Sequence, residues 1–140
     1  TAPLVHTRSY NFIKKTTGPL SFFKKTLKRK FNKSSSDPLF LDFHINDPLQ
    51  SKTVYLSWVK KLIAWNKKIN HSEPVENRIL IIQGAEDRTI DRYYNMTFLR
   101  KKFPLSEILL IENCRHQLHN EIKETRDRIF NMILNHLMIR

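Results

Sequence analysis

The stretch that decides the fold of this chain is Arg78-Ile79-Leu80-Ile81-Ile82-Gln83-Gly84-Ala85-Glu86-Asp87-Arg88. A second stretch repeats its design: Glu107-Ile108-Leu109-Leu110-Ile111-Glu112-Asn113-Cys114-Arg115-His116. Each is an apolar run of strand length followed by a turn that delivers one acid–base residue. Asp87 leaves the first run and His116 leaves the second, so two neighbouring strands would bring a carboxylate and an imidazole into contact.

The residues around these runs predict an α/β fold. Residues 79–82 and 108–111 read as strands buried on both faces. Between them, residues 94–103 read as a helix with Met96, Leu99 and Phe103 buried. A last helix over about 123–138 carries an apolar side made of Ile129, Phe130, Ile133, Leu134 and Leu137. The order strand–helix–strand–helix predicts a parallel strand pair.

The first half of the chain reads as helical, apart from residues 1–5, which we expect to end a strand. Leu20, Phe23, Leu27 and Phe31 share one helical face and predict a helix beginning after Gly18-Pro19. Asp37-Pro38 and Asp47-Pro48 each offer an N-cap followed by proline at the first helical position, which predicts helices over 38–45 and 50–69. The polar segment 71–74 then divides the chain into residues 1–73 and 74–140.

Composition narrows the class of protein. With 40% hydrophobic and 27% charged residues, the 140-residue chain reads as one globular domain that buries a core. No apolar run approaches the ~18 residues of a membrane span. Cys114 is the only cysteine, which excludes an internal disulfide and a thiolate metal cluster and favours a reducing compartment. The start at Thr1, without methionine, indicates a chain that begins inside a longer protein.

The formal net charge of +12 is unevenly placed along the sequence. Residues 1–36 carry +9 with no Asp or Glu, residues 37–70 carry +2, and residues 71–140 carry +1. Basic and aromatic residues alternate over residues 10–33, a pattern typical of docking on an anionic membrane. A cap helix with a solvated basic face explains the same pattern equally well. Nucleic-acid binding is the least favoured reading, since no recognised motif accompanies the charge.

Asp87 and His116 are the candidate catalytic residues. A carboxylate just beyond a buried strand can accept a hydrogen bond from imidazole Nδ1, fix its tautomer and stabilise the imidazolium. Asp87 is equally suited to cap the next helix or to pair with Arg88 or Arg92, although Asp91 lies nearer the helix start and fits the N-cap better. His119 is a rival for His116, and its place suggests a role in supporting the loop or capping the last helix.

Residues 79–88 and 112–121 resemble the C-terminal part of α/β-hydrolases, and the most similar branch is that of the lysophospholipases and monoacylglycerol lipases. The resemblance implies that Asp87 is the triad acid and that His116, the first of the pair His116-Gln117-Leu118-His119, is the triad histidine. It also implies that residues 6–73 form a helical cap. The implied substrate is an ester of a lysophospholipid or monoacylglycerol, with no metal or cofactor.

The chain departs from that family in lacking the nucleophile. The family's serine lies in a Gly-x-Ser-x-Gly elbow, whereas the only glycines here, Gly18 and Gly84, are too far apart to form one. We therefore expect the serine and the oxyanion segment in an N-terminal remainder of the core that partners this chain. Cys114 reads as a small buried filler rather than a replacement nucleophile.

Two readings of function follow from the sequence. The first is part of a cytoplasmic serine ester hydrolase, peripheral to the inner face of the membrane if residues 10–33 dock there. The second is a truncated, non-catalytic basic module that binds anionic membrane or nucleic acid. A Gly-x-Ser-x-Gly elbow upstream in the coding frame would favour the first.

Overall fold

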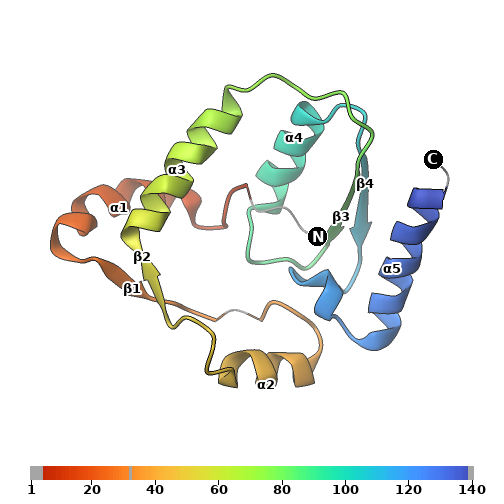
Figure 1. The fold of residues 1–140 in the computed structure, drawn as a ribbon, viewed down its shortest axis with the longest axis horizontal. Coiled ribbons are helices and arrows are strands. Elements are labelled where there is room, and N and C mark those ends of the chain that lie inside the picture. The colour runs from red at the N-terminus through yellow and green to blue at the C-terminus, as the bar shows by residue number, and fades with distance from the viewer. Residues whose placement is uncertain (1–4, 32, 139–140) are drawn as a thin grey trace.

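A computed structural model describes residues 5–31 and 33–138 (Figure 1). Its centre is a parallel pair of strands, β3 (Leu80–Gly84) and β4 (Glu107–Ile111), with Ile82 opposite Leu109. Helix α4 (Arg92–Lys102) connects them, and α5 (Lys123–Met138) follows β4. The predicted strand–helix–strand–helix order and the parallel pairing are therefore confirmed.

The alternation of side chains along the strands explains why both faces of the pair are covered. On one face Ile82 and Ile111 form a buried cluster with Cys114, Leu118 and Ile129, against which Met132 and Ile133 of α5 pack. On the other face Ile81 packs with Val5 and Leu99, joined by further residues of α4. Helices α4 and α5 thus lie on opposite sides of the strands (Figure 1).

The apolar cover is less complete than the sequence predicts. In α5, Ile129 is buried and Ile133 half-buried, but Phe130, Leu134 and Leu137 are exposed. Leu110 of β4 is 53% exposed, so β4 is not buried on both faces within the described residues. In α4 the prediction holds better, since Leu99 is buried and Met96 and Phe103 pack against the same cluster.

Residues 5–31 and 33–73 form three helices and a small antiparallel strand pair, and this part of the chain is called the cap below, after the element that the sequence predicts. Helix α1 (Tyr10–Phe23) lies beside α3 (Leu56–Asn70), and β1 (Thr26–Lys28) pairs with β2 (Thr53–Tyr55) (Figure 1). Helix α2 (Pro38–Asn46) begins as predicted, because Asp37 caps it by accepting hydrogen bonds from the backbone N–H groups of Leu39 and Phe40.

The predicted helix after Gly18-Pro19 is wrong. Helix α1 begins earlier, at Tyr10, and runs through Pro19, although the missing N–H of this proline costs the helix one bond to the preceding turn. Leu27 belongs to β1 instead, opposite Val54 of β2. The apolar residues that fit one helical face belong in part to the end of α1 and in part to β1. Periodicity alone does not distinguish a short strand from the continuation of a helix.

The second Asp-Pro pair also gave a wrong prediction. Asp47 closes a turn, in which its carboxylate accepts from the N–H of Leu49 and its carbonyl accepts from the N–H of Gln50. The β-branched residues Thr53 and Val54 then form β2, and the helix starts only at Leu56.

Backbone hydrogen bonds join the cap to the core at several points. The segment after Val5 meets the loop after β3, with an isolated bridge between Thr7 and Ile90 and a bond from Arg8 N to Thr89 O. Residues 1–4, where a strand end was expected, lie outside the described residues. None of the helices in the described part of the chain has the length and apolarity needed to cross a bilayer.

Candidate active site

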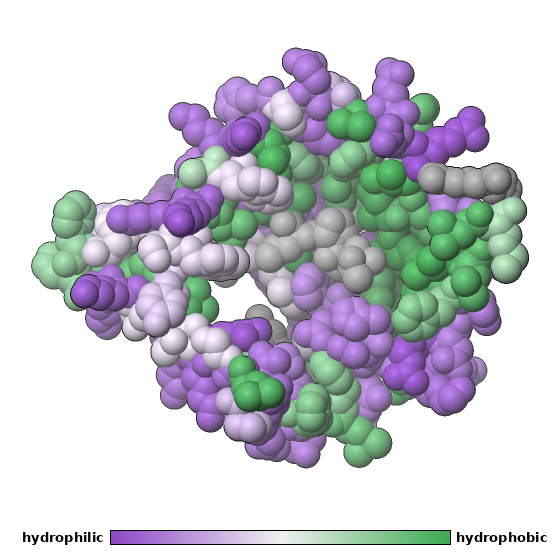
Figure 2. Space-filling view, viewed as in Figure 1, coloured by the Kyte–Doolittle hydropathy of each residue, from purple (hydrophilic) through white to green (hydrophobic). Residues whose placement is uncertain are grey.

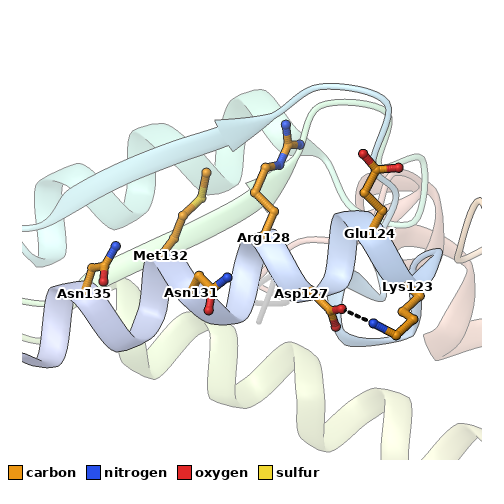
Figure 3. A pocket seen from close by; sticks show the side chains of 7 residues that line it. All are labelled: Lys123, Glu124, Asp127, Arg128, Asn131, Met132 and Asn135. Atoms are coloured by element: carbon orange, nitrogen blue, oxygen red, sulfur yellow. Dashed lines mark hydrogen bonds and ion pairs between the residues drawn. The ribbon is translucent and has the colours of Figure 1, made fainter.

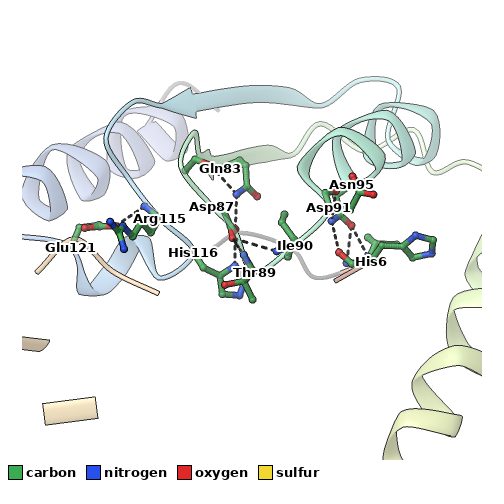
Figure 4. A network of polar contacts seen from close by, with 12 residues as sticks. His6, Gln83, Asp87, Thr89, Ile90, Asp91, Asn95, Arg115, His116 and Glu121 are labelled. Carbon is green, nitrogen blue, oxygen red and sulfur yellow. Dashed lines mark hydrogen bonds and ion pairs between the residues drawn. The ribbon is translucent and has the colours of Figure 1, made fainter. Parts of the chain in front are cut away.

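The structure brings Asp87 and His116 into direct contact. His116 Nδ1 lies 2.8 Å from Asp87 Oδ2 (Figure 4). Both side chains follow the carboxyl ends of adjacent parallel strands, where reactive groups gather in sheets of this kind. The spacing of the two stretches in the sequence thus produced the contact expected from it.

Asp87 is held as an ionised acceptor. Its side chain is fully buried, and it accepts hydrogen bonds from Gln83 Nε2 at 2.8 Å and from the backbone N–H of Thr89 at 2.8 Å. Burial works to raise its pKa, but the hydrogen bonds from His116 and Gln83, the attraction to His116 and the Thr89 N–H outweigh it, and the pKa lies below its ordinary value. An ionised carboxylate has no proton to donate, so His116 Nδ1 carries the hydrogen.

His116 is therefore oriented with its other nitrogen available. Its side chain keeps 21% of its surface exposed, whereas the side chain of Asp87 has none. With the hydrogen on Nδ1, the neutral ring presents Nε2 as a lone-pair acceptor. This arrangement can take a proton from a hydroxyl group and hold the resulting imidazolium against the carboxylate.

Gly84 allows the two loops to approach. A Cβ atom built there would lie 2.2 Å from Arg115 O and 2.5 Å from Cys114 O, closer than any side chain tolerates. Around this point the loops are joined by bonds from Ala85 N to Ile111 O and from Glu86 N to Cys114 O. Close packing of the two loop backbones is what sets Asp87 against His116.

The histidine loop is fixed from its other side by Glu121. This residue is 1% exposed, and its carboxylate accepts from the backbone N–H of Arg115 and from that of Ser36, each at 2.7 Å. A further backbone bond runs from Gln117 N to Ser34 O. The loop that carries His116 is thus tied to the segment of the cap that precedes α2.

The other candidates from the sequence take structural positions. Asp91 caps α4 by accepting from the N–H of Tyr94, as expected. His119 lies exposed in the short 3₁₀ helix η1 (Leu118–Asn120) and does not reach Asp87. Cys114 is fully buried, and burial raises the pKa of its thiol, which suits a filler and not a nucleophile.

Of the buried polar residues that the sequence did not reveal, three hold the site and the cap in place: Gln83, Asn95 and Glu121. Gln83 supports Asp87, while Asn95 binds the backbone of Val5 and His6 and so fixes the approach of the cap to α4 (Figure 4). The only sign of their burial in the sequence was that each is a polar residue within an apolar pattern, and at a single position this is weak evidence.

Among the cavities lined by described residues, two involve several elements of the cap. The apolar cavity, about 850 Å³, is enclosed mainly by α1 and α3 and includes Leu20, Phe23, Leu56, Val59 and Leu62. The basic cavity, about 830 Å³, is lined by Thr7, Arg8, Ser9, Ile13, Lys30, Lys33, Glu86, Arg88, Thr89 and Arg115. The basic cavity is lined by the residues next to Asp87 and His116 in the sequence: Glu86, Arg88 and Arg115. Figure 2 shows an opening between the cap and the core.

A third hollow lies on α5 (Figure 3). Its lining comes from that single helix, and within it Lys123 Nζ pairs with Asp127 Oδ2 at 2.5 Å. It contains neither Asp87 nor His116. The described residues include no group of three or more His, Cys, Asp or Glu side chains that could hold a metal ion.

Comparison with known families accounts for this arrangement. The model of the family described as serine aminopeptidase, S33, matches residues 1–123. The chain belongs to this family. Among curated proteins, none matches the sequence.

Two solved structures show which fold the family member has. A soluble variant of monoglyceride lipase from Saccharomyces cerevisiae, in complex with a substrate analog, is similar with a TM-score of 0.75 at 18% identity, over 94% of this chain and 51% of that chain. The monoacylglycerol lipase of Paleococcus ferrophilus is similar with a TM-score of 0.76 at 14% identity, over 94% and 54%.

These similarities confirm the predicted fold class. The chain has part of the α/β-hydrolase fold and is similar in structure to monoacylglycerol lipases. It spans about half the length of the two solved chains it matches. The hydrolase class predicted from residues 79–88 and 112–121 is therefore correct for the family.

Proposed function

We propose that this chain supplies the acid and the histidine of a serine ester hydrolase. The observation that carries the proposal is the Asp87–His116 contact, in which a buried carboxylate orients a partly buried imidazole. In the proposed reaction His116 Nε2 takes the proton of a serine hydroxyl as that oxygen attacks the ester carbonyl. His116 then gives the proton to the leaving alcohol, and Asp87 stabilises the imidazolium between the two transfers.

The nucleophile in this proposal comes from a segment N-terminal to Thr1, which also supplies the oxyanion donors. Residues 1–73 act as the cap and residues 74–140 as the C-terminal part of the core. The test is hydrolysis of monoacylglycerol and lysophospholipid by a protein that carries this chain behind a Gly-x-Ser-x-Gly segment. Absence of turnover on any carboxylic ester would leave the alternative of a non-catalytic basic module.

The chain by itself should have no esterase activity, because neither of its glycines belongs to an elbow that would expose a serine. We expect hydrolysis of a short-chain p-nitrophenyl ester at the rate of a buffer blank. Turnover that persists through purification and disappears in His116→Ala would mean that a nucleophile lies within these 140 residues.

A lipid ester is the proposed substrate class. The apolar cavity between α1 and α3 has about 850 Å³, which falls within the range of about 300–1,000 Å³ found for small-molecule sites. Its lining of Leu, Ile, Phe and Trp side chains suits an acyl chain. It is formed by cap residues, so the cap would hold the chain while the core holds the ester.

We also propose that the cap docks on anionic membrane through residues 10–33. Phe22 and Phe23 are 87% and 86% exposed, and Lys24 and Lys25 follow them at the end of α1. Figure 2 shows hydrophobic side chains gathered beside hydrophilic ones at this end of the cap. Exposed aromatic rings flanked by lysines match an interface between acyl chains and headgroups.

Replacing Lys24 and Lys25 with Gln should weaken binding to anionic vesicles, since each lysine near the surface contributes about 1 kcal/mol. The measurement is co-sedimentation with phosphatidylserine-containing vesicles over a series of salt concentrations. The matched control is Arg100→Gln with Lys101→Gln, which removes two charges from exposed positions of α4. Equal binding by wild type and both variants would mean that the basic face of α1 is only solvated.

A further inference from the structure

The basic cavity beside the candidate active site concentrates positive charge from four parts of the chain. Arg88 adjoins Asp87, Arg115 adjoins His116, Arg8 precedes α1, and Lys30 and Lys33 come from the segment between β1 and α2. Glu86 is the one acidic residue in the lining, so five cationic side chains face one carboxylate and the formal charge is +4.

In the part of the chain that the structure describes, these cations form no ion pair with an acidic side chain. Among residues 5–31 and 33–138 the ion pairs are His116–Asp87, Lys123–Asp127 and His136–Glu107, and none includes a residue of the basic cavity. Arg115 Nη1 donates to Lys33 O at 3.4 Å, which holds a core loop and the cap together at this point. Gathered cations without counter-ions raise the local potential and favour an anion.

The two cavities adjoin each other, since Thr7, Ile13 and Lys30 line both. A ligand with its acyl chain in the apolar cavity would carry its polar end into the basic cavity. The second cavity is lined by Glu86, Arg88, Thr89 and Arg115, which flank Asp87 and His116 in sequence. The polar end of such a ligand would therefore lie among residues that adjoin Asp87 and His116 in the sequence.

We infer that the basic cavity binds the phosphate of an anionic headgroup, so that the substrate is an acyl ester of a phosphorylated alcohol. This inference rests on the proposed function and selects within its substrate class. Arg and Lys donate charge-assisted hydrogen bonds to phosphate oxygens, and the fork of Arg88 or Arg115 can bind two of them. A neutral glycerol headgroup would leave the same cations without a partner.

The test measures lipid binding by the 140-residue chain, which is expected not to hydrolyse its ligand. The probes are monodecanoylglycerol and the same lipid phosphorylated on its free primary hydroxyl, each below its critical micelle concentration, in isothermal titration calorimetry. We expect the phosphorylated lipid to bind at least about tenfold more tightly. Lys33→Gln combined with Arg88→Gln should reduce this ratio toward one.

The control is again Arg100→Gln with Lys101→Gln, which removes the same charge outside the cavity and should keep the ratio. All four side chains are exposed, so both variants should fold, and thermal melts would check this. Equal affinities of the two lipids for the wild type would overturn the inference and leave the proposed function standing. Binding of neither lipid would count against the proposed lipid substrate as well. Inorganic phosphate that binds as tightly as the phosphorylated lipid would assign the cavity to free phosphate.

Discussion

Replacing His116 with Ala, or Asp87 with Asn, should each lower kcat by roughly 10⁴-fold in the enzyme that contains this chain, by comparison with other serine hydrolase triads. The first change removes the base. In the second, Asn can still accept the Thr89 N–H that now binds the carboxylate, so the loop keeps its turn. The NH2 group of Asn, however, would donate a hydrogen bond to His116 Nδ1. The imidazole would then adopt the tautomer with its hydrogen on Nε2, which cannot accept the proton of the serine. The measurement is kcat on a monoacylglycerol ester.

The matched control for this prediction is His119→Ala. His119 lies three residues beyond His116, on the exposed side of η1, and does not contact Asp87. Its loss should change kcat far less, and thermal melts of all three variants would separate loss of the base from loss of the fold. An enzyme that needs His119 and tolerates loss of His116 would show that the wrong histidine of the pair has been assigned.

The candidate site was predictable because its two side chains follow simple strand signals. The apolar runs before Asp87 and His116 are β-branched and leucine-rich, and parallel strands deliver their ends to one edge. The residues that hold Asp87 and His116 in place could not be predicted from the sequence. Gln83, Glu121 and the close approach at Gly84 depend on which loops meet in space, and one sequence does not carry that information at any single position.

The fold divides in the same way. In the core, the long apolar runs predicted the right elements: the bounds of β3, β4 and α4 lie within two residues of those predicted, and α5 has the predicted bounds. In the cap, short elements compete. Leu27 and Val54 fit a helical spacing, yet they face each other across β1 and β2 because pairing of these two segments satisfies the backbone between α1 and α3. Tertiary pairing overrides periodicity most easily where an element is only a few residues long.

Replacing Gly84 with Ala should destabilise the chain by about 3 kcal/mol, the cost of forcing one extra carbon into a closed contact. The added Cβ would lie 2.2 Å from Arg115 O and 2.7 Å from Cys114 C, and both atoms belong to the backbone, which cannot turn aside as a side chain can. The midpoint of thermal unfolding, followed by circular dichroism, should fall by roughly 10 °C. Because Arg115 precedes His116, the displaced loop should also carry the imidazole away from Asp87.

The chain offers its own control, since Gly18 is its only other glycine. It lies inside α1, and a Cβ there would meet nothing within 4 Å. Alanine favours a helix interior over glycine by about 0.5–1 kcal/mol, so Gly18→Ala should raise the unfolding midpoint slightly. Neither glycine has a positive φ, so backbone strain does not distinguish them. The opposite changes in the unfolding midpoint would therefore report the space available to the added Cβ. A Gly84→Ala chain that unfolds at the temperature of the wild type would mean that the loops of Asp87 and His116 are not packed backbone to backbone.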